Sequence, residues 1–146
     1  MAELRDITEE VLPQCAAAYQ KAYGEAPWNE SFSTEPLTRY LRAFLHSDVK
    51  CGYCFMENEQ IVGIALGLLV PCFDAPFFRL EDFCIAPEYQ RQGYGGRFLR
   101  EISAKVKALG CDSMLLGTQR GYPSHKFYLR EGFQEIASVL LYRDLS

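Results

Sequence analysis

Two stretches near the N-terminus carry apolar residues at helical spacing. A weakly alternating run at residues 3–7 comes before them and indicates an edge strand. The first helical stretch ends at Gly24 and has apolar positions at Val11, Leu12, Cys15, Ala16, Tyr19 and Tyr23. After a loop at residues 27–30, Thr34 can cap a second helix that has Pro36 in its first turn. The apolar face of this helix is formed by Leu37, Tyr40, Leu41, Phe44 and Leu45.

The middle and end of the chain alternate between strand-like and helix-like patterns. Residues 49–57 and 61–70 flank Asn58 and Glu59, which predicts an antiparallel hairpin, and residues 77–85 predict a further strand. A helix over residues 97–109 ends at Gly110, and a strand over residues 113–117 follows. A short helix over residues 123–130 and a final strand or strand pair over residues 133–142 complete the prediction. The order indicates a mixed α/β (α+β) fold.

Length and composition limit the classes of protein. The 146 residues suit one domain with one core, covering residues 1–146. The net charge is −4, and no more than two Lys or Arg residues are adjacent, so we expect no nucleic-acid partner. The longest apolar stretch, residues 61–73, contains two glycines and a proline and is too short to span a bilayer. The first residues show no signal-peptide pattern, and we expect a cytoplasmic protein.

Six cysteines raise the question of metal binding. Cys51 and Cys54 form a Cys-x-x-Cys pair, but no second pair and no nearby histidine completes a zinc site. In a strand, these two positions also face opposite sides. We therefore expect buried free thiols and no metal ion.

A glycine-rich run, residues 90–96, lies between a strand-like and a helix-like segment. Glycines at Gly93, Gly95 and Gly96 leave backbone N–H groups open beside a helix N-terminus, where an anion binds well. A dinucleotide fingerprint would need glycine at position 98, which is Phe98, and the chain has no Gly-Lys-Ser/Thr tripeptide for a Walker A loop. The pattern predicts a phosphorylated cofactor of another kind.

The run Pro87-Glu88-Tyr89-Gln90-Arg91-Gln92-Gly93-Tyr94-Gly95 resembles the acyl-CoA pyrophosphate loop of the GNAT superfamily of N-acetyltransferases. The order of predicted elements fits this superfamily over nearly the whole chain. The resemblance implies a mixed, mostly antiparallel twisted sheet with flanking helices, and strands that splay apart around acyl-CoA. It implies acetyl-CoA as co-substrate, bound by backbone of Phe83, Cys84, Ile85, Arg91, Gln92, Gly93, Tyr94, Gly95 and Gly96. The side chains of three basic residues could contact the phosphates, namely Arg91, Arg97 and Lys126. Each could equally well be a charged surface residue in contact with solvent.

Two carboxylates interrupt the apolar strand over residues 77–85. Its Leu-Glu-Asp-Phe sequence resembles a strand of polyamine-type acetyltransferases, in which the glutamate acts as general base directly or through water. Glu81 matches this glutamate. The alternative is a structural carboxylate that meets solvent or Arg79. Because adjacent strand residues face opposite sides, we expect Asp82 to have a supporting or structural role.

The run over residues 122–133 resembles the last motif of the superfamily, in which a tyrosine protonates the departing CoA sulfur. Tyr128 matches this tyrosine, and the alternative is a core aromatic residue. Gly121 stands where many members have an asparagine, so that contact is expected to be absent or to be made by a neighbour such as Gln119. Cys84 has no cationic partner and is not expected to act as a nucleophile. His46 and His125 are interpreted as structural or surface groups.

The hypothesis from the sequence is an acetyl-CoA-dependent N-acetyltransferase that transfers acetyl directly to a primary amine of a small molecule. One alternative is a non-catalytic acyl-CoA-binding sensor. Another is acetylation of a protein or peptide. The sequence does not identify the amine, and homodimerisation is an expectation that rests on the resemblance alone.

Overall fold

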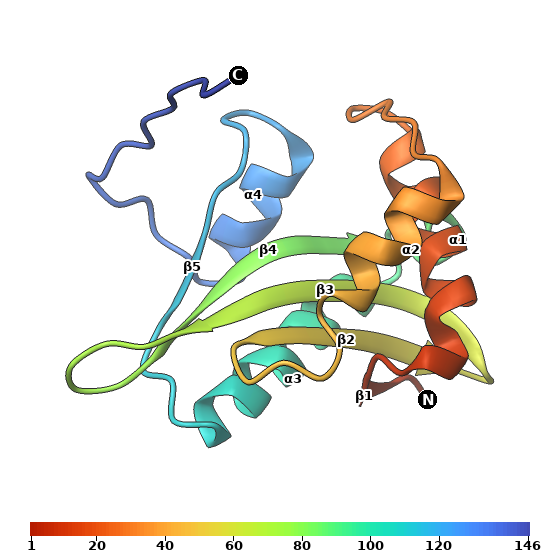
Figure 1. Ribbon diagram of the computed structural model, residues 1–146, viewed down its shortest axis with the longest axis horizontal. Coiled ribbons are helices and arrows are strands. Elements are labelled where there is room, and N and C mark those ends of the chain that lie inside the picture. Colours follow the sequence, from red (N-terminus) through yellow and green to blue (C-terminus); the bar gives the residue numbers. More distant parts are fainter.

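A five-stranded sheet in the order β1-β2-β3-β4-β5 forms the centre of the computed structural model, which describes all 146 residues (Figure 1). The elements in chain order are β1 (Glu3–Asp6), the 3-10 turn η1 (Glu9–Val11), α1 (Leu12–Gly24), α2 (Thr34–Arg42), β2 (Lys50–Glu57), β3 (Gln60–Val70), β4 (Phe77–Ile85), the 3-10 turn η2 (Pro87–Tyr89), α3 (Tyr94–Ala108), β5 (Met114–Leu116) and α4 (Pro123–Arg130). The order and type predicted from the sequence are confirmed as far as α4.

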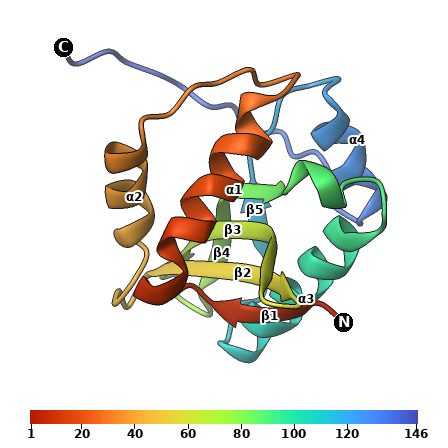
Figure 2. The same ribbon diagram turned by 90° about the vertical axis from the view of Figure 1, so that its right-hand side faces the viewer.

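Helices cover both faces of the sheet, and each face has its own apolar core. α1 and α2 pack on one face, where Ile64 and Leu66 of β3 belong to the core (Figure 2). α3 and Tyr128 of α4 pack on the other face, where Val62 of β3 lies. Because β3 is covered on both sides, residues 61–67 of this strand are all buried, which explains their continuous apolar sequence. No helix is both long enough and apolar enough to cross a lipid bilayer.

The sheet opens between β4 and β5. Strands β1 to β4 pair antiparallel in sequence, whereas β5 pairs parallel to β4 and only over Phe78–Leu80. From Glu81 to Ile85, the edge of β4 that faces β5 has no strand beside it. This is the splayed arrangement that the resemblance implied.

A bulge in β4 changes the direction of the two carboxylates. Leu66 of β3 pairs with Asp82, but the next residue of β3 pairs with Leu80, so Glu81 is an extra residue without a partner opposite. Glu81 forms an ion pair with Arg79 on the face covered by α1 and α2, and Asp82 accepts hydrogen bonds from those helices. The prediction that the adjacent carboxylates lie on opposite faces is therefore wrong, because the bulge interrupts the alternation.

The predicted strand over residues 133–142 is also wrong. No helix or strand follows α4, and residues 134–146 make no backbone–backbone hydrogen bond. Their apolar side chains are exposed, with Leu140 and Leu141 at 94% and 91%. The segment has the composition of a strand but no neighbouring backbone to pair with.

Candidate active site

The N-terminus of α3 presents open backbone donors. Gly93 is the N-cap and has a φ of 86°, in the left-handed region that glycine adopts without strain. The first intrahelical bond runs from the Arg97 N–H to the Gly93 carbonyl, and no side chain caps the helix. The N–H groups of residues 94–96 therefore lie at the positive end of the helix dipole without a protein acceptor. The helix begins three residues before the predicted start, so Gly95 and Gly96 belong to its first turn.

Two glutamines fix the loop that leads into α3. The Gln90 side chain donates to the Ile85 carbonyl at 2.9 Å, and the Gln92 side chain donates to the Glu88 carbonyl at 3.0 Å. Arg91 between them has a φ of 62°. The side chains thus hold the loop, while the backbone of residues 93–96 remains available for a ligand.

The three basic candidates differ in their surroundings. Arg97 donates to the Ala2 carbonyl at 3.3 Å and lies over the ring of Phe55, so its side chain is used in packing. Arg91 and Lys126 are exposed and form no ion pair. Only these two remain candidates for phosphate contacts.

The open edge of β4 exposes the backbone of odd-numbered residues. The Tyr23 hydroxyl meets both the N–H and the carbonyl of Phe83, at 3.3 and 3.2 Å. The Ala86 N–H points the other way, to the Val62 carbonyl in β3. Since backbone groups alternate along a strand, Phe83 and Ile85 face the open edge, and the Cys84 N–H faces β3. The N–H groups that face the open edge beside Cys84 are therefore those of Phe83 and Ile85.

Tyr128 of α4 lies close to this edge. Its ring packs against Phe83, Phe127 and Phe133, and the residue is only 9% exposed. Its hydroxyl has no hydrogen-bond partner in the protein. Burial, with smaller contributions from Cys84 and Asp82, raises the pKa of Tyr128 above its usual value. The hydroxyl is therefore protonated at neutral pH.

Asp82 is the better enclosed of the two carboxylates. It accepts hydrogen bonds from the Tyr19 hydroxyl of α1, at 3.1 Å, and from the Tyr40 hydroxyl of α2. Burial raises the pKa of Asp82, the two hydroxyl hydrogen bonds oppose this rise, and the charge of Glu81 adds to it. Glu81 is more open, since its side chain is 38% exposed and forms a 2.6 Å ion pair with Arg79. Asp82, rather than Glu81, is therefore the carboxylate that α1 and α2 enclose.

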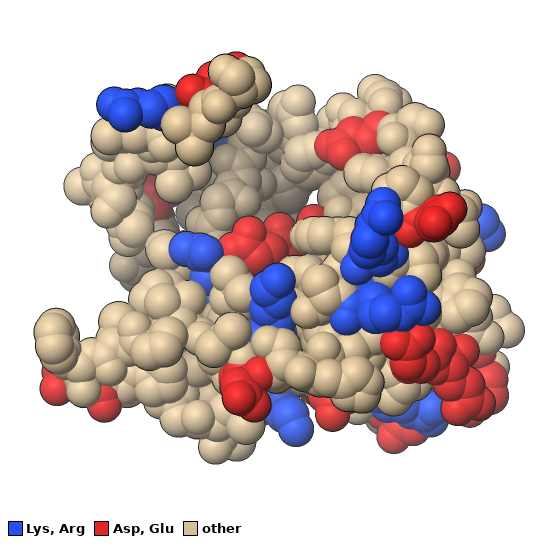
Figure 3. All heavy atoms as spheres, in the orientation of Figure 1, with Lys and Arg blue, Asp and Glu red and all other residues tan.

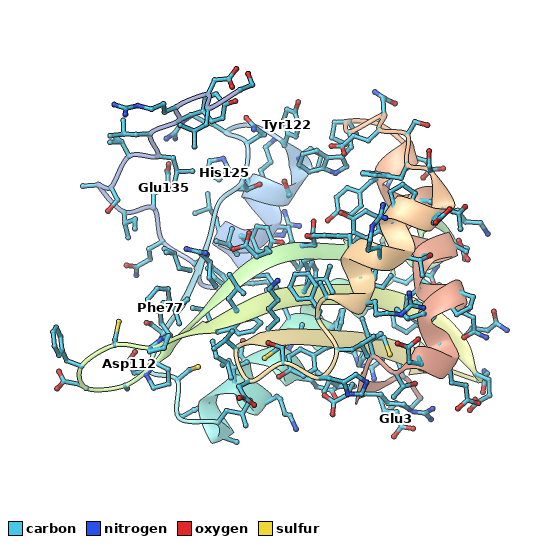
Figure 4. The ribbon with its side chains drawn as sticks, viewed as in Figure 1. Glu3, Phe77, Asp112, Tyr122, His125 and Glu135 are labelled. Atoms are coloured by element: carbon cyan, nitrogen blue, oxygen red, sulfur yellow. The ribbon has the colours of Figure 1, made fainter.

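Aromatic side chains from three segments form a chain of ring contacts that begins at Tyr19, a hydrogen-bond partner of Asp82. Tyr19 contacts Tyr23 and Phe32, and Trp28 of the α1–α2 loop contacts Tyr122 at a centroid distance of 5.3 Å. Tyr122 lies at the start of α4 on the side of that loop (Figure 4). No sequence motif marked these residues as part of a site, although the four-residue spacing of Tyr19 and Tyr23 placed both on one helix face.

A hollow opens above β4, between α4 and the end of the chain on one side and α1 and α2 on the other (Figure 3). Acidic atoms lie on its floor, over the strand that carries Glu81 and Asp82. The hollow can accept an amine, because acidic groups on its floor attract a positive charge.

The remaining candidates are not part of this site. Burial raises the pKa of the Cys84 thiol to about 12, which argues against a nucleophilic role. All six cysteines are free; five are buried or half-buried as expected, while Cys72 is exposed. His125 accepts a hydrogen bond from the Gly121 N–H at 3.1 Å, in agreement with a structural role. The Tyr94 hydroxyl donates to Glu57, so only the backbone of Tyr94 faces the loop.

Solved structures of acetyltransferases have the same architecture. The aminoglycoside N-acetyltransferase AAC(6')-Iy, in complex with CoA, superposes with a TM-score of 0.81 at 17% identity, over 100% of this chain and 96% of that one. A GNAT family acetyltransferase of Staphylococcus aureus subsp. aureus USA300_TCH1516 gives a TM-score of 0.79 at 17% identity, over 97% and 98%. At these identities, the likeness establishes an acetyltransferase fold.

The sequence itself then identifies the family. The model of the acetyltransferase (GNAT) family matches residues 12–133, and the chain belongs to this family. A curated relative, the uncharacterized N-acetyltransferase CgeE of Bacillus subtilis (strain 168), is 22% identical over 123 residues, which are 84% of this chain. The chain spans about half, 48%, of the length of that relative.

Proposed function

We propose that the chain is an acetyl-CoA-dependent N-acetyltransferase that acts on a primary amine of a small molecule by direct transfer. In this proposal, residues 1–146 form one acetyltransferase domain. The observation that carries it is the position of the open β4 edge. That edge lies between the uncapped N-terminus of α3, which suits a phosphate anion, and Tyr128, which can donate a proton.

The residues present fit acetyl-CoA as a substrate. The N–H groups of residues 94–96 would hold its pyrophosphate, with Arg91 and Lys126 as nearby positive charges. Phe83 and Ile85 would pair with its pantetheine arm as an added strand pairs with a sheet edge. The Tyr23 hydroxyl binds the N–H and the carbonyl of Phe83, and it would have to release both groups when the pantetheine arm pairs with them.

The chemistry requires three proton transfers. As the amine nitrogen bonds to the acetyl carbon and the carbon–sulfur bond breaks, Tyr128 gives its proton to the departing sulfur. The nitrogen of the new amide gives up its second proton, which returns to Tyr128 through water and restores the neutral hydroxyl. Before the attack, the ammonium group loses a proton to the Glu81–Asp82 pair, directly or through water. We assign this proton to Asp82, because burial raises its pKa towards that of a useful base, while Glu81 is held by Arg79. A backbone N–H of Phe83 or Ile85 would stabilise the oxyanion.

The surroundings of Asp82 favour a small amine as acceptor. Its carboxylate attracts the ammonium group, and the rings of Tyr19, Tyr40 and Trp28 provide faces against which the rest of the molecule can pack. The contact between Trp28 and Tyr122 crosses the hollow and narrows the access for a folded protein substrate.

The test is release of free CoA from acetyl-CoA with a panel of polyamines, aminoglycosides, aryl-alkylamines, amino acids and peptides with free N-termini. Mass spectrometry of each mixture would identify the acetylated product. We expect turnover with at least one small primary amine and little with peptides. Binding of CoA without turnover across the panel would indicate the sensor, and turnover confined to peptides would indicate a protein acetyltransferase.

A further inference from the structure

A groove lies between α1, α2 and the loop that joins these two helices, which cover the same face of the sheet (Figure 2). Its volume of about 390 Å³ is near the lower end of the range for small-molecule sites. Most of its lining is aromatic or apolar and comes from Tyr19, Phe32, Pro36, Leu37 and Tyr40, and two serines form the rest. No charged side chain lines it. The groove therefore suits one uncharged group that contains a ring.

The groove and Asp82 share two side chains. Tyr19 and Tyr40 line the groove, and their hydroxyls both donate to the Asp82 carboxylate. The carboxylate and the groove are therefore no further apart than about the length of a tyrosine side chain. A single small molecule reaches both places when a short chain of carbon atoms joins its ammonium group to its ring.

The aromatic side chains around the groove are already arranged to receive another ring. Phe32 meets Tyr19 edge to face at a centroid distance of 5.2 Å, and Tyr40 meets Tyr19 in the same way at 6.4 Å. The Gln20 side chain donates to the Phe32 carbonyl at 3.0 Å, which holds the loop against α1. Aromatic rings prefer edge-to-face contacts of this kind. A ring that enters the groove is therefore stabilised without a rearrangement of the loop.

The charges around the groove favour an amine with a single ammonium group. Glu81 is neutralised by its ion pair with Arg79, which leaves Asp82 as the carboxylate that can hold a cation. Glu25 and Glu30 of the loop are exposed and do not line the groove. A second ammonium group of a polyamine or an aminoglycoside would lose its water in the groove and find no counter-charge there. The groove therefore selects against amines with several charges.

Given the proposed acetyltransferase function, on which this inference rests, we propose that the acceptor is an arylalkylamine. This is a primary amine with one positive charge and a short alkyl chain that ends in an aromatic ring. The ammonium group lies at Asp82, and the ring lies in the groove against Phe32 and Tyr40. The transfer converts the ammonium form of the amine and acetyl-CoA into the neutral N-acetylamide, CoA with a free thiol, and one proton that passes to solvent. Phe32 is then a residue that determines specificity.

Steady-state kinetics with matched amines provides the first test. Phenethylamine carries the ring, propylamine is a primary amine without it, and spermidine and neamine carry several charges. We expect kcat/KM for phenethylamine to exceed that for propylamine by about ten- to a hundredfold, the effect of burying one ring. It should exceed the values for spermidine and neamine by at least about tenfold.

The outcomes separate the substrate class from the proposed function. Equal values for phenethylamine and propylamine overturn the arylalkylamine assignment. A preference for spermidine or neamine also overturns it, but leaves the acetyltransferase function intact. No turnover with any amine overturns both.

Substitution of Phe32 provides a second test, with a readout that does not depend on turnover. Phe32→Ala removes one wall of the groove, and Phe73→Ala removes an exposed ring of the β3–β4 loop as the matched control. Phenethylamine is titrated calorimetrically into each protein saturated with CoA. We expect about tenfold weaker binding in Phe32→Ala alone, with the KM for propylamine unchanged. Equal affinity in all proteins overturns the assignment.

Ser33→Asp keeps the assignment testable where Phe32→Ala does not fold. Ser33 lines the groove and is the N-cap of α2, a position that suits aspartate, so the fold should be retained. The added carboxylate is a counter-charge for a second ammonium group. We expect the ratio of kcat/KM for spermidine to that for phenethylamine to rise about threefold. A ratio that stays at the wild-type value overturns the assignment, and circular dichroism shows whether each variant is folded.

Discussion

Tyr128 combines a buried ring with a hydroxyl that no group of the protein binds. A purely structural tyrosine in this position usually has a partner for its hydroxyl. Tyr128→Phe retains the ring packing and removes only the proton donor. We expect turnover to fall about 10²- to 10⁴-fold, the usual range for a general acid, with the affinity for acetyl-CoA unchanged.

Steady-state kinetics and a binding titration check this result. Tyr142→Phe, which removes an exposed hydroxyl close to the C-terminus, is the matched control and should retain wild-type turnover. Turnover of Tyr128→Phe within about threefold of the control would show that Tyr128 is a packing residue.

The two carboxylates differ in their partners, and so they should differ in their importance for turnover. Asp82→Asn retains the shape of the side chain but cannot accept the ammonium proton. We expect kcat/KM at neutral pH to fall about 10²- to 10⁴-fold in this variant, and only about tenfold or less in Glu81→Gln. An equal or larger loss in Glu81→Gln would return the base role to Glu81, as the sequence alone suggested.

A substitution of Tyr40 tests the base role of Asp82 through the pH dependence of kcat/KM. Its hydroxyl donates to Asp82 and holds the pKa of that carboxyl below the value that burial alone would give. Tyr40→Phe should therefore raise the pKa of Asp82. Because the ionised carboxylate is the active form, activity is lost as the pH falls through this pKa. The acid limb of the kcat/KM profile should move to higher pH.

The profile of Tyr142→Phe should overlie that of the wild type. A limb of the Tyr40→Phe profile that stays in place, or moves to lower pH, would contradict the assignment of Asp82 as the base. Acetyl-CoA binding is measured alongside, since an unchanged affinity excludes a general loss of structure.

The sequence indicated which residue types form the site, but not their directions. Two carboxylates in an apolar strand were recognisable, and the resemblance to a known motif made Tyr128 a candidate. The bulge that turns Glu81 and Asp82 to one face depends on how β3 pairs with β4, which no local pattern contains. The two tyrosine partners of Asp82 were not predicted either, since they come from α1 and α2.

At the scale of elements, the sequence pattern predicted the four α-helices and the five strands of the sheet, but neither 3-10 turn. The start of α3 was placed at residue 97 because glycines were interpreted as loop. Gly95 and Gly96 instead form its first turn. Their N–H groups have no partner within the helix, but water can bind them, so the turn loses no stability. The strand expected over residues 133–142 illustrates the opposite error. A strand exists only when another backbone pairs with it, so an apolar sequence alone cannot establish one.

At the scale of the whole molecule, the site is formed where four parts of the chain meet: the open edge of β4, the N-terminus of α3, α4, and the α1–α2 region. The Trp28–Tyr122 contact joins segments that are far apart in sequence, and sequence reasoning could not find it. The splay between β4 and β5 holds these parts around one space. Acetyl-CoA binding at the α3 N-terminus is the central claim, because every catalytic assignment depends on it.

A substitution at Gly95 tests acetyl-CoA binding at the α3 N-terminus directly. A side chain there would begin 3.4 Å from the ring of Phe127 and 3.7 Å from Ile85, in the space between α4 and the end of β4. A glutamate at this position would fill that space and offer its own carboxylate to the open N–H groups. It would also suit a helix N-terminus, so the fold should be retained. Gly24→Glu makes the same substitution at the exposed end of α1 and serves as the control.

Calorimetric titration of acetyl-CoA into the wild type, Gly95→Glu and Gly24→Glu is the most direct measurement. We expect saturable binding with equal affinity in the wild type and Gly24→Glu. In Gly95→Glu we expect at least about a tenfold weaker affinity, a loss of about 1.4 kcal/mol. No binding to the wild type, or equal affinity in all three proteins, would contradict the assignment of the α3 N-terminus as the acetyl-CoA site.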